Sequence, residues 1–162
     1  MKKFEKIIAI IAVIALVMKY LQIPGGALLM MLSFGVLAVF YYIFGSALFN
    51  DIELRFKELF DRKVFDEIIN FKNKSDALTT FIEKLTRWGL SAALLGILFK
   101  LQHFPGANIL LLIGISTLII VTIVSMVKYR ETRSEVYLRM FIRTAIIGGL
   151  GLILFILSFL AN

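Results

Sequence analysis

A short polar motif occurs twice in this 162-residue chain, each time between two long apolar runs. The first copy, residues 18–26, reads MKYLQIPGG, and the second, residues 99–107, reads FKLQHFPGA. Proline lacks a backbone N–H and disfavours helix in the residue before it, while glycine supplies the backbone angles that a chain reversal needs. Each copy therefore predicts the end of one helix and the start of the next, with turns at Pro24-Gly25 and Pro105-Gly106. The chain is predicted to contain two helical hairpins.

The two copies also carry polar side chains at matching positions. Lys19 aligns with Lys100, and Gln22 aligns with His103. Within each copy the two residues are three apart, so they share one face of the helix end. These four residues are candidate contacts for another protein. The alternative is that they only anchor and orient the helix ends at the membrane interface.

The apolar runs are long enough to cross a lipid bilayer. Apolar residues make up 60% of the chain, against ~45–50% in ordinary soluble domains. The expected spans are residues 7–23, 26–49, 88–104, 107–127 and 144–161. Residues 1–23 resemble a signal peptide, but no small-x-small cleavage site follows, so we expect an uncleaved first span. The sequence thus predicts an all-α membrane protein with five transmembrane helices: two tandem, parallel hairpins and a C-terminal span.

Charged segments separate the hairpins and precede the last span. Residues 50–84 alternate charged residues with apolar ones at a spacing of three to four, which predicts an amphipathic helix. We expect this helix to lie on the lipid headgroups; the alternative is that it packs on the protein itself. The chain then divides into a first hairpin (1–49), the amphipathic segment (50–84), a second hairpin (85–128), and a basic loop with the fifth helix (129–162).

The distribution of charge predicts the orientation in the membrane. With the N-terminus in the cytoplasm, 16 of the 18 basic residues and all 11 acidic residues lie on the cytoplasmic side. Basic residues favour that side. We therefore expect a bacterial inner-membrane protein with a cytoplasmic N-terminus, a periplasmic C-terminus and both Pro-Gly turns in the periplasm. The net charge of +7 then reflects topology rather than binding of nucleic acid.

The chain offers few residues for catalysis or metal binding. It has no cysteine and one histidine, which excludes disulfides and thiolate chemistry. His103 is predicted to lie on the opposite side of the membrane from every acidic residue, so a catalytic triad lacks its members. No glycine loop of a phosphate-binding pattern is present. We expect no catalytic residue, no cofactor, no metal and no enzymatic activity.

Several motifs of the second hairpin occur together. They are Trp88-Gly89-Leu90-Ser91, Gly96, Phe99-Lys100, His103-Phe104-Pro105-Gly106-Ala107 and Ile113-Gly114. With these motifs, residues 88–127 resemble the helical hairpin of the gliding-motility L protein (GldL) family. That family forms the inner-membrane ring of the motor for gliding and type IX secretion, together with a partner that crosses the membrane once and extends into the periplasm.

The resemblance implies an inner-membrane location, and Lys100 and His103 match polar positions that the family uses. The family also has an essential glutamate in the helix after the turn, whereas no acidic residue occurs from Leu101 to Arg130. The function that we expect is therefore a structural or interaction subunit of a membrane complex. It would contact the lipid bilayer, a single-span or periplasmic partner, and a second copy of itself. The alternative is a small transporter or channel, which polar residues clustered on one face of the last two spans would favour.

Overall fold

The computed structural model describes residues 2–50 and 77–160, and this part of the chain forms five α-helices and no strand. The helices are α1 (Lys2–Tyr20), α2 (Gly26–Phe49), α4 (Ala77–Leu101), α5 (Ala107–Thr132) and α6 (Glu135–Leu160). The prediction of an all-α fold is confirmed. Most of the predicted amphipathic segment, residues 51–76, lies outside the described residues.

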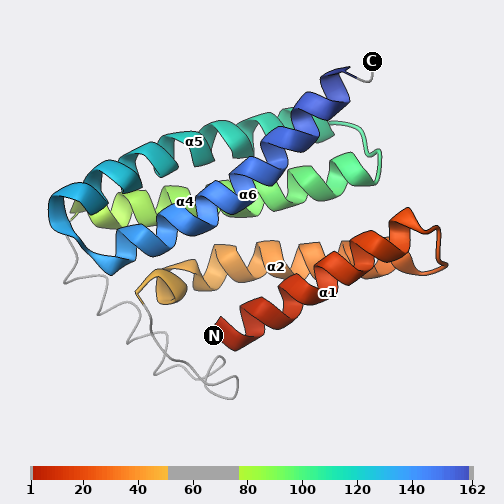
Figure 1. Ribbon diagram of the computed structural model, residues 1–162, viewed down its shortest axis with the longest axis horizontal. Helices are drawn as coiled ribbons and strands as arrows, with labels where there is room; N and C mark the ends of the chain where they lie inside the picture. Colours follow the sequence, from red (N-terminus) through yellow and green to blue (C-terminus); the bar gives the residue numbers. More distant parts are fainter. Residues whose placement is uncertain (1, 51–76, 161–162) are drawn as a thin grey trace.

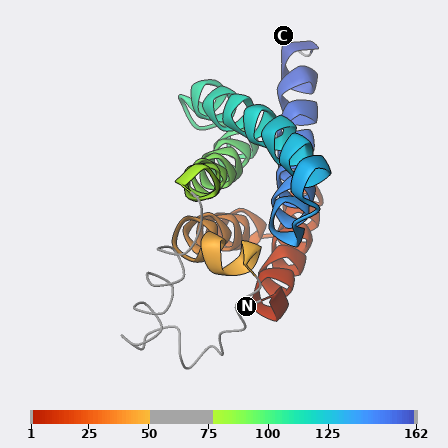
Figure 2. The ribbon, with the colours of Figure 1, turned by 90° about the vertical axis from the view of Figure 1, so that its left-hand side faces the viewer.

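The two hairpins, α1–α2 and α4–α5, lie side by side with both turns at the same end of the molecule (Figure 1). Helix α6 packs along α5, also contacts α4 and touches α2. Viewed from the end opposite the turns, α1 and α6 lie together on one side, with α2 and α4 on the other (Figure 2). The molecule therefore has a turn end and an opposite end, where the N-terminus and the α5–α6 connection lie.

Small residues let the helices of the second hairpin approach closely. A Cβ atom added to Gly114 would lie 2.5 Å from the backbone nitrogen of Ala93, and one added to Gly96 would lie 2.7 Å from the Cα of Leu111. At the equivalent positions of the first hairpin, 81 residues earlier, stand Ser33 and Ala15, which are also buried. Small residues at helix interfaces are typical of membrane proteins, where van der Waals packing replaces the hydrophobic effect.

Among the helices of residues 2–50 and 77–160, three are long and apolar enough to cross a membrane: α2, α5 and the stretch Glu135–Leu157 of α6. The outer faces carry many exposed apolar side chains, among them Ile10 at 60% and Ile109 at 67% exposure. Such faces suit contact with lipid tails. The chain is therefore a membrane protein with several candidate spans.

The helices extend further into the charged segments than the sequence predicted. Helix α4 begins at Ala77, before the span predicted from residue 88, and most of the basic connection predicted between the fourth and fifth spans is helical instead of a loop. Only residues 133–134 separate α5 from α6. Neither proline nor glycine interrupts residues 115–143, and Met140 is fully buried, so packing extends α6 toward the connection. Helix α5 ends where Arg133 takes a left-handed conformation and its N–H bonds the carbonyl of Tyr129.

Candidate functional site

The two turns have the same backbone conformation. Gln22 and His103 both adopt a positive φ, 56° and 59°, and the glycines that follow at 25 and 106 have φ of 88° and 79°. Positive φ is uncommon outside glycine. Both turns therefore hold a polar, non-glycine residue in the left-handed region, two positions after the end of the preceding helix.

Four backbone hydrogen bonds of the first turn have counterparts in the second, and the first turn has one more, from Gly26 N–H to the Ile23 carbonyl. Gln22 N–H donates to the Lys19 carbonyl at 3.0 Å, and its counterpart His103 N–H donates to the Lys100 carbonyl at 3.2 Å. The next residue of each turn, Ile23 or Phe104, donates to the carbonyl five positions earlier at 2.9 Å in both cases. The backbone thus places the lysine and the polar residue alike in the two turns.

The lysine of the first turn donates hydrogen bonds to the second hairpin. Lys19 Nζ donates to the carbonyl of Leu101 and to Gln102 Oε1, the latter at 3.3 Å. Gln102 Nε2 in turn donates to the carbonyl of Ala27 at 3.0 Å. Gln22 is exposed. Lys19 therefore joins the two hairpins at the turn end, so its predicted role in contacting a partner would compete with these bonds.

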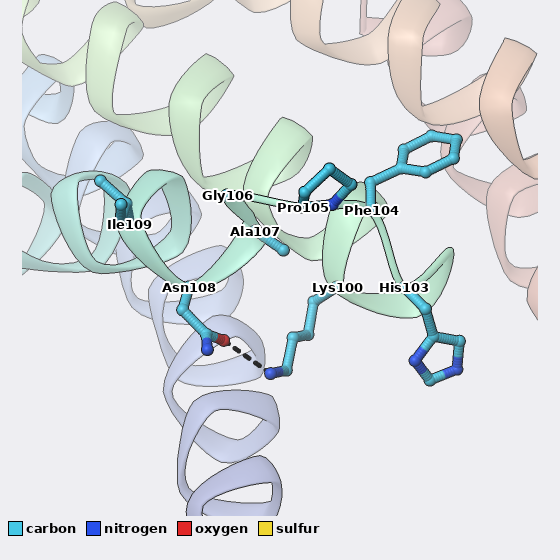
Figure 3. Close-up of a pocket in the computed structure, with 8 residues that line it drawn as sticks. All are labelled: Lys100, His103, Phe104, Pro105, Gly106, Ala107, Asn108 and Ile109. Carbon is cyan, nitrogen blue, oxygen red and sulfur yellow. Dashed lines mark hydrogen bonds between the residues drawn. The ribbon is translucent and has the colours of Figure 1, made fainter.

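The lysine of the second turn has a different environment. Lys100 Nζ donates to Asn108 Oδ1 at 2.6 Å, and the His103 side chain is exposed without a hydrogen bond to any other described residue. Figure 3 shows Lys100 directed toward Asn108, with the imidazole pointing away from the turn. These three side chains line a cavity of about 450 Å³ together with residues 104–107 and Ile109. The counterpart of Asn108 in the first turn is Ala27, which cannot offer a polar side chain.

The opposite end holds a buried charge cluster that joins α1, α2 and α6. Arg143 binds Glu5 with two hydrogen bonds of 2.8 Å, and the Tyr41 hydroxyl donates to the same carboxylate at 2.5 Å. The side chains of Arg143 and Glu5 are only 16% and 14% exposed. Burial raises the pKa of the Glu5 carboxyl, but hydrogen bonds from Arg143 and Tyr41 outweigh burial, so the net pKa lies below its ordinary value. The carboxylate is therefore held ionised.

A second buried carboxylate lies between α2 and α4. Glu83 is 6% exposed and accepts a hydrogen bond from Asn50 Nδ2 at 2.9 Å. Burial raises its pKa, an effect that Asn50, Ser46 and Arg87 only partly offset. The Arg87 stem covers Gly45, where an added Cβ would lie 2.4 Å from its Cγ. Within residues 2–50 and 77–160, no three carboxylate or histidine side chains gather in a group that could hold a metal ion.

Helix α6 contacts matching positions of both hairpins with neighbouring residues. Arg143 reaches Glu5 and Tyr41 of the first hairpin, while Thr144 accepts a hydrogen bond of 2.8 Å from Thr122 of the second. Thr122 stands 81 residues after Tyr41, so it is the counterpart of that tyrosine. The last helix therefore binds both hairpins at equivalent sites, through an ion pair on one side and a hydroxyl pair on the other.

Sequence reasoning missed this charge cluster, because it treated the charges near the helix ends as solvated determinants of orientation. Two signals were present in the sequence. Glu5 is the one acidic residue among the lysines at positions 2, 3 and 6, and Arg139 and Arg143 have the spacing of one helix face. Arg139 Nη1 donates to the carbonyl of Phe49 at 3.2 Å, so this face of α6 also neutralises the C-terminal end of α2.

An apolar groove of about 330 Å³ runs along the side of the second hairpin. Small residues at positions 89, 91 and 92 of α4 form part of its lining. Trp88 also lines the groove, and 63% of this residue is exposed. The full lining consists of Tyr42, Leu85, Trp88, Gly89, Ser91, Ala92, Leu95, Leu110, Ile113 and Thr117.

Residues 85–139 match the family model of the GldL N-terminal domain. The match begins within α4, covers all of α5 and ends in the first turn of α6. The resemblance expected for the second hairpin is thereby confirmed for this part of the chain. No curated protein and no solved structure matches the sequence. All but one of the residues that line the groove belong to the GldL-like segment, as do the three polar residues of the turn cavity.

Proposed function

We propose that the protein is a five-span subunit of the bacterial inner membrane, with its N-terminus in the cytoplasm and both turns in the periplasm. Helices α1 and α4 add two spans to the three apolar ones, because each pairs along its length with an apolar helix of its own hairpin. The asymmetry of basic residues supports the orientation. The position of both turns at one end supports two parallel hairpins derived from one duplicated unit (Figure 1).

The subunit acts as a structural or interaction component of a membrane complex, and not as an enzyme. The observation that carries this proposal is the groove, because it lies on the segment that matches the GldL N-terminal domain. Its small residues allow a second helix to approach closely, which is how membrane helices associate. The motor activity of gliding and type IX secretion is not part of the proposal, because the sequence from Leu101 to Arg130 contains no carboxylate that could carry protons.

The occupant that we propose for the groove is the apolar helix of a single-span partner. Helix-in-groove contact depends on close van der Waals packing, so it is sensitive to the size of the lining residues. Partner contact through Lys100, His103 or Gln22 stays a prediction from the sequence.

Photo-crosslinking in native membranes tests this function. A photoreactive amino acid at Ser91, which lines the groove, should capture one predominant protein with a single apolar span. The matched control is Ser116, an exposed serine of the same hairpin whose side chain is absent from the groove lining. In the chain without a crosslinker, Ser91→Leu should abolish co-purification of that protein in mild detergent, and Ser116→Leu should not.

The crosslinking outcomes separate the alternatives. A product of twice the 18.4 kDa chain mass would replace the single-span partner by a second copy of the protein. Capture of lipid alone at Ser91, with both leucine variants behaving alike, would overturn the proposed function.

Labelling of single cysteines tests the orientation independently. The natural chain has no cysteine, so Asn108→Cys at the turn end and Ser134→Cys at the opposite end each provide a unique thiol. In intact spheroplasts an impermeant reagent should label Asn108→Cys and leave Ser134→Cys unlabelled. The reverse pattern would invert the proposed topology.

A further inference from the structure

We propose that the cavity at the second turn binds a phosphate group, supplied by the headgroup of an anionic lipid. Lys100, His103 and Asn108 are the polar side chains of its lining, and none of the acidic residues that the structure describes lines it. The volume of about 450 Å³ is ample for a phosphate with part of its glycerol backbone. The charge of the lining and the volume of the cavity therefore suit an anion of this size.

The polar groups retain donors for such an anion. A lysine ammonium has three hydrogen-bond donors, and one of them at Lys100 points at Asn108 Oδ1. This bond also orients the amide, since its oxygen is turned to Lys100 and its NH₂ group remains available as a donor. The imidazole of His103 carries an N–H that no other described residue accepts. Together the three residues offer an ammonium charge and further N–H donors around one open space.

The position of the cavity favours a lipid over a soluble ligand. It lies at the end of a hairpin whose helices carry exposed apolar side chains, and its own lining includes Phe104 at 39% and Ile109 at 67% exposure. A polar site next to an apolar surface at the end of a span is level with the headgroup phosphates. Placing the cavity at the depth of the headgroup phosphates rests on the membrane orientation proposed above. A protein carboxylate would fit the charge, but the lipid phosphate is already present at this depth.

The first turn shows which features a phosphate site needs. It has the same backbone, yet Lys19 is bonded to the second hairpin, Gln22 replaces His103, and Ala27 replaces Asn108. We therefore expect no such site there, and Lys19 serves as an internal control for Lys100.

Native mass spectrometry of the full chain, released from detergent after incubation with phosphatidylglycerol, tests the proposal. The wild type should retain one phosphatidylglycerol with higher occupancy than phosphatidylcholine of the same chain length. Lys100→Met should weaken retention roughly tenfold, because it removes the charged donor. Asn108→Ala, which copies the first turn, should weaken it in the same direction, and Lys19→Met should leave it unchanged. Thermal unfolding of each variant confirms that it is folded.

Control measurements distinguish a lipid phosphate from free phosphate and test whether the cavity binds either one. Excess inorganic phosphate should fail to displace the lipid; displacement would replace the lipid by free phosphate as the ligand of the same site. Equal loss in Lys19→Met and Lys100→Met, or equal retention of the two lipids, would overturn the proposal. A photoreactive amino acid at position 108 tests for a protein ligand. If it captured an acidic partner helix and the captured complex held no lipid, that protein would replace the lipid as the ligand of the cavity. The groove variant Ser91→Leu should retain phosphatidylglycerol normally, so failure of the proposed function leaves this test intact.

Discussion

The two hairpins share one backbone design and use it differently. Both turns share four corresponding backbone hydrogen bonds and have matching left-handed residues. The side chain of the first lysine turns toward the neighbouring hairpin, whereas that of the second stays within its own turn, next to Asn108. The Pro-Gly sequence thus determines how the chain reverses, and the surrounding side chains determine whether a turn holds the molecule together or faces its surroundings.

The same contrast occurs at the opposite end. The first hairpin presents Glu5 and Tyr41 to α6, and the second presents Thr86 and Thr122 at the equivalent positions. One side is therefore an ion pair in a buried setting, and the other is a set of hydroxyls that mostly bond their own helices. Breaking the contact of α6 with the first hairpin should therefore lower the free energy of unfolding more than breaking its contact with the second.

The largest effect is expected at the ion pair. Arg143→Met leaves Glu5 buried and unpaired, which should lower the free energy of unfolding by about 3–5 kcal/mol. Thr144→Val at the neighbouring position should cost about 1 kcal/mol, because it removes one neutral hydrogen bond. Thermal and denaturant unfolding in one detergent compares them. Equal losses of unfolding free energy in the two variants would show that α6 stabilises its contacts with the two hairpins equally.

Acid titration sharpens that prediction. The pKa of Glu5 is lower in the folded protein than its ordinary value of 4.5. The ion pair therefore stabilises the protein above that value, and this stability is lost as the pH falls through the folded pKa. Glu5→Gln should be less stable than the wild type at neutral pH and should lose less stability on acidification. The double variant Glu5→Leu/Arg143→Met should recover much of the loss, since neither charge is then left unpaired.

The next effect concerns the packing within each hairpin. Gly114→Ala puts a methyl group against the backbone of Ala93, so it should cost about 1–3 kcal/mol through overpacking. Ser33→Ala, the equivalent change in the first hairpin, removes only a hydroxyl that bonds the Met30 carbonyl and should cost about 1 kcal/mol or less. The two apparent melting temperatures test this order. A wild-type melting temperature for Gly114→Ala would mean that α4 and α5 separate without cost.

A smaller difference is expected between the two turn lysines. Lys19→Met removes the bonds to Leu101 and Gln102 and should lower stability by about 1.5 kcal/mol. Lys100→Met should change stability by no more than about 0.5 kcal/mol, because its bond to Asn108 is exposed. Both variants are measured without added phosphatidylglycerol, so that lipid binding does not contribute. If Lys100→Met is the less stable of the two, the assignment of roles to the turns is wrong.

No effect at all is expected on proton permeability. Glu5 and Glu83 belong to the starting portions of α1 and α4, and the turns follow the far ends of these helices. The helices after the turns contain no acidic residue in positions 26–49 and 107–130. A proton path needs a group near the midplane that takes up and releases protons. Liposomes with the pure protein should therefore take up protons no faster than empty ones. Flux above this background that His103→Ala abolishes would favour the channel alternative.

The sequence predicted the all-α fold because Pro24-Gly25 and Pro105-Gly106 interrupt apolar runs that are otherwise long and uniform. It overestimated the loop before α6, because charge was taken to mean loop although residues 135–143 contain no helix breaker. It named Lys19 and Lys100 as equivalent, and only the packing of the hairpins distinguishes them. The sequence marks Glu5 and Arg143 as unusual charges, but it could not pair them, since the contact depends on where α6 lies relative to α1.

The contact between Glu5 and Arg143 also has a consequence for biosynthesis. Arg143 follows Glu5 by 138 residues, so it leaves the ribosome roughly 7 to 28 seconds later at about 5–20 residues per second. During that interval the first hairpin has been made, but the Glu5 carboxylate lacks its cation. The nascent hairpin must therefore keep Glu5 near water or protonated until α6 is inserted. Helix α6 thus completes the environment of a helix that is synthesised much earlier.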